Sequence, residues 1–250
     1  MASYSATFYD GQVDESQASA AAVVPAVMAL LHPASIIDIG CGVGGWLKAF
    51  QDAGVVDIAG QDGSWVQPAN LLIDPAHFTA RDLGADTPPP ARRYDLAMTL
   101  EVAEHLHASK ADTFVGYLCA CADVVLFSAA VPGQGGTHHV NEQRLSYWVE
   151  KFAAQGFDHF DVLRPRLWDD RRIAWWYRQN ITLFARRGSA PHPRLERELR
   201  QMAWPVDITH PEGFFHKADF KARFWDRPRF TLRRDLGAFG RRVRRSLGLS

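Results

Sequence analysis

The chain has 250 residues, of which 47% are hydrophobic and 22% are charged, a composition typical of soluble globular proteins. Basic and acidic residues number 28 each, so the net charge is zero and does not indicate a nucleic-acid-binding protein. The longest apolar run, 18–31, is too short for a bilayer and follows acidic residues, so we expect neither a membrane span nor a signal peptide. The three cysteines lack the spacing of a zinc site and indicate a reduced, cytoplasmic protein.

The predicted elements begin in an N-terminal part, 1–34. Residues 1–17 are polar and aperiodic, which predicts either a flexible arm or a lid over a ligand, and 18–31 predict a helix. Further helices are predicted at 44–53, 102–106, 114–122 and 141–155. Strands are predicted at 35–39, 55–61, 71–73, 95–100, 124–130, 157–163 and 181–186. This alternation indicates an α/β fold, a parallel sheet with helices on both faces, whose last two strands fit an antiparallel pair.

The first predicted strand ends in a glycine-rich turn. An apolar, β-branched run from Ile36 contains Asp38 and is followed by four glycines, Gly40, Gly42, Gly44 and Gly45. Glycines let the backbone approach a ligand closely, and the helix that follows offers free N–H groups. A dinucleotide-binding loop is the alternative interpretation, but it uses another glycine spacing and needs no acid before the first glycine.

The stretch from Ile36 to Trp46 resembles motif I of the class I S-adenosylmethionine (SAM) methyltransferases. The resemblance implies a Rossmann-like, doubly wound sheet of seven strands with the last strand antiparallel, and a SAM-binding domain over 35–187. It implies that Asp38 holds the methionine part of SAM, that Asp82-Leu83 meets the adenine, and that Leu100 lines the methionine side. The predicted cofactor residues are Asp38, Gly40, Cys41, Gly42, Gly44, Trp46, Asp62, Asp82, Leu83 and Leu100.

An aspartate at the end of the second strand could accept hydrogen bonds from both ribose hydroxyls of such a cofactor. Asp62 has this position, eighteen residues after Gly44, whereas the alternative, Asp57, lies inside the predicted strand. Each of these aspartates taken alone could equally cap a loop or face solvent in a turn.

Three ionisable residues follow the fourth predicted strand. Glu101, Glu104 and His105 are spaced i, i+3 and i+4, so on a helix their side chains would share one face beside the methyl donor. His138 and His139 follow the fifth strand, whose carboxyl end neighbours that of the fourth, so this pair can reach the same pocket. Two glutamates and one or two histidines suit a magnesium, manganese, iron or zinc ion.

The pattern resembles the small-RNA 3′-terminal 2′-O-methyltransferases, which carry Glu-x-x-Glu-His and a later His-x-x-Glu and bind a divalent ion that grips a vicinal diol. The resemblance implies four metal ligands and catalytic residues, Glu101, Glu104, His105 and His139. Asn141 and Gln143 stand where that family has an aromatic pair. Three interpretations stay open: a metal site, a metal-free base or substrate contact, and a structural role.

Two further segments, 127–136 and 175–180, resemble a bacterial subgroup of these enzymes associated with sugars and secondary metabolites. Aromatic planes beside amides and arginines suit a sugar ring or a flat polar acceptor, although the aromatic residues 175–177 could instead fill the gap between the last two strands. We therefore predict SAM-dependent methyl transfer to a hydroxyl of a small polar or glycosylated molecule. The alternatives are an N-methyltransferase or RNA 2′-O-methyltransferase, and a non-catalytic methyltransferase-like binding module.

Residues 188–250 form a predicted C-terminal extension that starts with a linker at 188–193. Apolar residues at helical spacing alternate there with arginines: Leu232, Leu236, Phe239, Val243 and Leu247. This basic amphipathic tail predicts a helix packed on its own domain or on a homodimer partner, or else a contact with a membrane or another acidic surface, or plain disorder.

Overall fold

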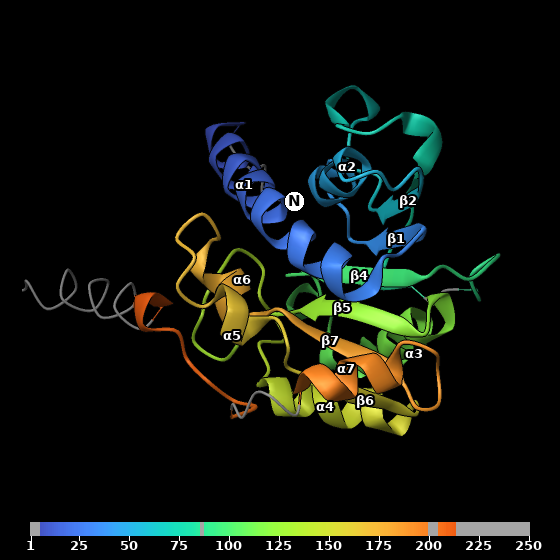
Figure 1. The fold of residues 1–250 in the computed structure, drawn as a ribbon. Helices are drawn as coiled ribbons and strands as arrows, with labels where there is room; N and C mark the ends of the chain where they lie inside the picture. The colour runs from blue at the N-terminus through green and yellow to red at the C-terminus, as the bar shows by residue number, and fades with distance from the viewer. Residues whose placement is uncertain (1–5, 86–87, 200–204, 214–250) are drawn as a thin grey trace, which may run out of the picture. The chain divides into compact units, whose positions relative to one another are not determined.

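The computed structural model describes residues 6–85, 88–199 and 205–213 of the chain. Its core is a seven-stranded sheet in the order β3-β2-β1-β4-β5-β7-β6 (Figure 1). The strands are β1 (Ser35–Ile39), β2 (Asp57–Asp62), β3 (Phe78–Ala80), β4 (Leu96–Leu100), β5 (Val124–Ser128), β6 (Phe157–Phe160) and β7 (Thr182–Arg186). The pairs among β1 to β5 are parallel, and β7 runs antiparallel to both of its neighbours. The predicted doubly wound sheet with a reversed last strand is confirmed.

The helices are α1 (Ala6–Leu31), α2 (Gly45–Asp52), α3 (Ala111–Cys121), α4 (Leu145–Ala154), α5 (Arg164–Leu167), α6 (Trp175–Asn180) and α7 (His192–Leu199). The helices and the sheet enclose two apolar layers, one on each face of the sheet, because successive residues of a strand face opposite sides. Ile36 packs in the layer that includes α1 and α2, whereas its neighbour Ile37 packs in the layer that includes α3 and α4. Burying the sheet on both faces explains its near-continuous apolar strands.

The chain divides into two compact units, Met1–His210 and Pro211–Ser250, and all seven strands belong to the first. The amphipathic tail of the sequence analysis, with Leu232 to Leu247, lies outside the described residues. Within the part of the chain that the structure describes, no helix has both the length and the apolar character needed to cross a bilayer.

The structure corrects two predicted elements near the N-terminus. The first helix begins at Ala6, so residues 6–17 are not the aperiodic arm that their polar sequence predicted. Ser16 ties this part of α1 to the domain, because its hydroxyl accepts a hydrogen bond from Trp46 Nε1 (3.1 Å) and lies 3.3 Å from the Tyr177 hydroxyl. The third strand is β3, not the predicted strand 71–73. Residues 71–73 are irregular, because Ile73 packs over Gly44 and the amide of Leu72 donates a hydrogen bond to the carbonyl of Val43.

Two predicted helices beyond β4 are also different. Residues 102–106 form only a 3₁₀ turn, Ala103–His105, and α4 begins at Leu145 instead of 141. The amides of Val140 and Asn141 donate to the carbonyl of Glu104, at 2.9 and 3.0 Å, and Arg144 just before α4 has an extended backbone, with φ −65° and ψ 153°.

Phe152 of α4 provides a test of this core. It is fully buried and stacks on Phe184 of β7, with ring centroids 3.9 Å apart and planes at 9°. We expect Phe152→Ala to lower the free energy of unfolding by about 3–5 kcal/mol, measured by urea denaturation, because a cavity replaces the ring. The control is Glu150→Ala on the exposed side of the same helix, where a change of less than about 0.5 kcal/mol is expected. Equal effects of the two substitutions would contradict the assigned helix face.

Candidate active site

The glycine turn after β1 is a left-handed backbone segment at the carboxyl edge of the sheet. Gly40 and Gly44 have φ angles of 89° and 84°, which side chains larger than hydrogen rarely tolerate. The amides of Gly40 and Cys41 both donate to the carbonyl of Gln61 in β2, at 2.7 and 3.1 Å. A Cβ added to Gly40 would come within 2.3 Å of Val102, so the turn packs directly against the segment that follows β4.

Two buried carboxylates lie beside this turn. Asp62 ends β2 and accepts hydrogen bonds from the amides of Gly42 (2.7 Å) and Gly63 (2.6 Å). Burial raises the pKa of Asp62 despite these bonds, and burial together with the charge of Asp62 raises the pKa of Asp38 well above its usual range. Among the described residues, none donates a hydrogen bond to the Asp38 carboxylate, which is only 3% exposed. The pair therefore lacks a cationic partner within this part of the chain.

The other predicted cofactor residues occupy different environments. Asp57 begins β2 and pairs with Arg92 at the opposite edge of the sheet, so Asp62 is the aspartate beside the glycine turn. Asp82 is exposed and caps its own turn, with its carboxylate accepting from the Gly84 amide (2.8 Å). It follows Arg81, whose amide donates to the Asp62 carbonyl (2.7 Å), so Asp82 also lies near this edge.

Four more of these predicted residues are apolar or packed in the interior. Cys41 and Leu100 are buried in the same apolar layer, and burial strongly raises the pKa of the Cys41 thiol. Leu83 packs against the opposite layer. The indole of Trp46 is held by its hydrogen bond to Ser16 and by an edge-to-face contact with Tyr177 at 5.1 Å.

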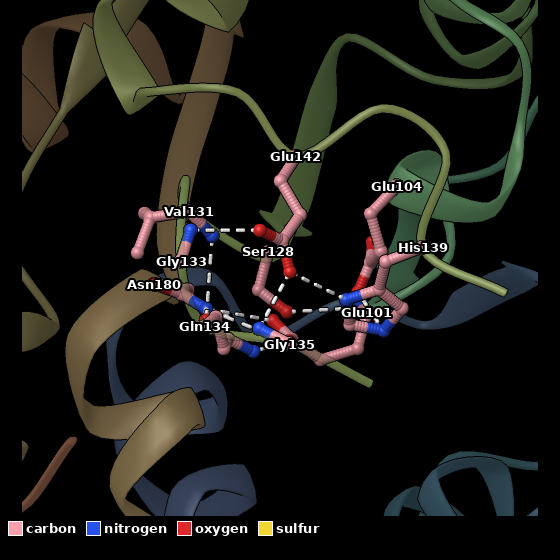
Figure 2. Close-up of polar contacts among 10 residues, drawn as sticks. All are labelled: Glu101, Glu104, Ser128, Val131, Gly133, Gln134, Gly135, His139, Glu142 and Asn180. Carbon is pink, nitrogen blue, oxygen red and sulfur yellow. Dashed lines mark hydrogen bonds and ion pairs between the residues drawn. The ribbon is translucent and has the colours of Figure 1, made fainter. Parts of the chain in front are cut away.

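Glu101 does not share a helix face with Glu104 and His105, contrary to the prediction. It has a φ angle of 56°, and its amide donates to Ser128 at the end of β5. Its carboxylate accepts hydrogen bonds from Gln134 Nε2 (2.7 Å) and Asn180 Nδ2 (3.1 Å), as Figure 2 shows. Burial raises the pKa of Glu101, although the hydrogen bonds from these two amides oppose the shift.

Glu104, His105 and His139 come together instead. Each offers a ligand atom within 4.8 Å of the others, and the two imidazole rings meet edge to face with centroids 4.9 Å apart. The Glu104 carboxylate is fully buried, and neither oxygen has a hydrogen-bond partner among the described residues; His139 Nε2 lies 4.0 Å from Oε1. Burial and the charge of Glu101 raise the pKa of Glu104 well above its usual range, while burial and His139 lower that of His105.

Sequence reasoning missed two residues of this site. Glu142 places Oε1 3.0 Å from His139 Nδ1 and accepts the amides of Gly133 and Gly135. Although partial burial would raise the pKa of Glu142, the hydrogen bond from His139 and those from the two amides hold it below its usual value. The His-x-x-Glu spacing was the available signal for Glu142. Nothing in the sequence connects Asn180 with Glu101, 79 residues earlier.

A cavity of about 310 Å³ has Asn180 in its lining. It lies between the end of β5, the start of α4, the end of α6 and the segment 206–209. Its lining includes Ala129, Pro132, Arg144, Trp148, Asn180 and Thr209. Asn180 belongs both to the lining of the cavity and to the hydrogen-bond network of Glu101.

The sheet topology is that of a class I SAM-dependent methyltransferase. The family model described as a methyltransferase domain matches residues 15–227, and the chain belongs to this family. SAM is therefore the expected cofactor class of the protein. No curated protein matches the chain.

Three solved structures show the same fold. Magnesium protoporphyrin IX methyltransferase from Synechocystis PCC 6803, with bound S-adenosylhomocysteine (SAH), is 18% identical, with a TM-score of 0.52 over 74% of this chain and 90% of that chain. The methyltransferase domain of the bacterial CtHen1-C is 18% identical, with a TM-score of 0.50 over 68% and 97%. CalS10, an amino pentose methyltransferase from Micromonospora echinaspora, is 15% identical, with a TM-score of 0.51 over 74% and 99%.

The buried Glu104 carboxylate predicts a pH-dependent stability. Its folded-state pKa lies above its unfolded-state value, so the folded protein binds the extra proton and stability falls as pH rises between the two values. We expect Glu104→Gln to be more stable than the wild type by at least about 1 kcal/mol at pH 8, with the difference vanishing toward pH 4. Urea unfolding at several pH values, with a chelator present, measures this. A pH-independent difference, or one equal to that of Glu150→Gln, would contradict the assignment.

Proposed function

We propose that the protein transfers the methyl group of SAM to a hydroxyl of a small polar or glycosylated molecule, and that Glu104, His105 and His139 form the reactive cluster. The observation that carries this proposal is the direct packing of Gly40 on Val102. Val102 lies between Glu101 and the turn that bears Glu104 and His105, so a cofactor on the glycine turn would have its reactive end beside the cluster.

The residues beside the glycine turn fit the charge of SAM. Asp38 and Asp62 are buried carboxylates whose pKa values are raised, and the described residues supply no cation to offset Asp38. When bound, SAM supplies an already activated methyl group on a positively charged sulfur. We propose that Asp38 holds the methionine end and that Asp62 and the Gly42 backbone hold the ribose, with Asp82, Leu83 and Leu100 completing the binding site.

The cavity beside Asn180 supports a small acceptor. Its volume of about 310 Å³ is near the lower limit for small-molecule pockets and suits a single ring system better than a polymer. The indole of Trp148 and the side chains of Arg144, Asn180 and Thr209 offer an aromatic plane together with polar groups, a combination that suits a hydroxylated ring. Two of the structural neighbours are named for small acceptors, a porphyrin and an amino pentose.

His139 is the residue that we propose takes the hydroxyl proton as the methyl group is transferred. Its side chain is 12% exposed, and its Nε2 atom faces Glu104 without reaching hydrogen-bond distance. A positioned base of this kind contributes about 10²–10⁴-fold to a rate, and alignment of the acceptor contributes more.

The same three side chains form the group that could hold a divalent ion among the described residues. One carboxylate and two imidazoles suit borderline ions such as zinc, iron or manganese, and a bound ion would lower the pKa of the acceptor hydroxyl. Glu101 lies outside this group, because its carboxylate is held by Gln134 and Asn180.

The role of Asp38 is tested by SAM binding. A raised pKa in the free protein means that binding a cation at this carboxylate releases a proton, so SAM affinity should rise with pH until Asp38 is ionised in the free protein. We expect Asp38→Asn to weaken SAM binding about 10–100-fold and to remove this pH dependence. Isothermal titration calorimetry in two buffers of different ionisation enthalpy measures both.

Asp52→Asn, at the exposed end of α2, serves as the matched control for Asp38→Asn and should bind SAM as the wild type does. Unchanged SAM affinity in Asp38→Asn would show that the carboxylate does not contact the cofactor.

The reaction itself is tested by SAH production against a panel of hydroxylated small molecules, amines and RNA. We expect turnover with hydroxylated small molecules, a loss of about 10²–10⁴-fold in His139→Ala, and unchanged SAM affinity in that variant. His107→Ala, at an exposed histidine nearby, is the control and should retain activity.

The outcomes of this panel separate the alternatives. Turnover with amines alone, or with RNA at a steep salt dependence, would replace the proposed acceptor by another class. SAM binding without turnover in any mixture would identify a binding module. Activity lost to a chelator and restored by one divalent ion would show that the reaction needs an ion, for which Glu104, His105 and His139 are the proposed ligands. Chelator-resistant activity would leave His139 as the base without an ion.

A further inference from the structure

Glu142 is held in place from three directions. Its carboxylate accepts hydrogen bonds from the amides of Gly133 (2.7 Å) and Gly135 (2.6 Å), and its Oε1 atom lies 3.0 Å from His139 Nδ1 (Figure 2). The side chains of Glu142 and His139 are only 19% and 12% exposed. These bonds fix the carboxylate relative to the loop that follows β5.

This arrangement determines which ring nitrogen of His139 carries the proton. An ionised carboxylate only accepts hydrogen bonds, and two backbone N–H groups already donate to this one. The third contact therefore needs a donor, which is Nδ1–H of His139. The lone pair of the neutral ring is then on Nε2, the atom that lies 4.0 Å from Glu104 Oε1.

Gly136 leaves the space that the His139 ring occupies. A Cβ added to Gly136 would lie 2.2 Å from Nε2 and 2.4 Å from Cε1, so the imidazole lies against the backbone of this residue. Any larger residue at 136 would displace the ring. The loop 133–136 thus acts twice, since two of its amides hold Glu142 and one of its glycines leaves room for His139.

We propose that Glu142 is a positioning residue that holds His139 in the Nδ1–H tautomer and directs the Nε2 lone pair toward Glu104 and His105. Oriented in this way, Nε2 can take a proton from an acceptor hydroxyl or bind an ion, and an imidazole with the opposite tautomer can do neither. The inference rests on the proposed function only for the catalytic consequence, because the tautomer itself can be observed without turnover.

The tautomer is read from the ¹⁵N chemical shifts of the histidine rings in the labelled protein, with a chelator present and His139 assigned from His139→Gln. We expect a protonated Nδ1 and an unprotonated Nε2 in the wild type at alkaline pH, where histidine rings are neutral. In Glu142→Ala this preference should be lost, whereas Glu150→Ala, at an exposed glutamate of α4, should leave it unchanged. A proton on Nε2 in the wild type, or no response to Glu142→Ala, would overturn the proposal.

Kinetics provide the second readout. We expect Glu142→Ala to lower kcat about 10–100-fold with the KM for SAM unchanged, as for other residues that orient a functional histidine. Gly136→Ala should have a similar effect with the Glu142 carboxylate intact, while Gly116→Ala in α3, where nothing lies closer than 3.9 Å to the new Cβ, should not. Full activity in Gly136→Ala would count against the positioning of His139.

These readouts fail separately from the proposed function. If the tautomer follows Glu142 but no variant, including the wild type, methylates any acceptor, the positioning role stands and the proposed reaction does not. If Glu142→Ala has the same urea unfolding midpoint as the wild type and the same SAM affinity, a general loss of structure is excluded as the cause of its slower turnover.

Discussion

The site depends on one backbone interaction, the pair of hydrogen bonds that Val140 and Asn141 donate to the carbonyl of Glu104. These bonds join the turn after β4 to the loop after β5 and place His139 beside Glu104 and His105. The segment between this contact and α4 stays irregular, and α4 begins at Leu145 after the extended backbone of Arg144. A parallel sheet brings both strand ends to one edge, but these two bonds set the distance between the side chains.

Two glutamates separated by three residues acquire opposite environments. Glu101 is bound by the amides of Gln134 and Asn180, whereas Glu104 is fully buried with no hydrogen-bond partner among the described residues. An unpaired buried carboxylate destabilises the folded state, and proteins retain such groups where they bind a ligand or take part in a reaction. The contrast supports assigning the reactive role to Glu104 and a structural role in the network to Glu101.

The proposed cofactor side of the site also contains buried carboxylates without a cationic partner among the described residues. Asp38 and Asp62 are close enough for the charge of one to raise the pKa of the other, and a positive ligand would relieve both. Because Gly40 packs on Val102, the site with these two carboxylates and the histidine cluster lie next to each other along the edge of the sheet. A donor and an acceptor bound on either side of Val102 would therefore meet without a large movement of the chain.

The sequence by itself determined the alternating fold, the glycine turn and the position of Asp62, because buried parallel strands and left-handed glycines leave local patterns that neighbouring residues suffice to reveal. Tertiary structure alone decided the length of α1, the position of β3, the separation of Glu101 from Glu104, and the roles of Glu142 and Asn180. Ser16, Ile73 and Asn180 owe their roles to contacts with residues distant in the chain. Such contacts leave no periodicity in the sequence, since they arise only when separate strand ends converge on one edge of the folded sheet.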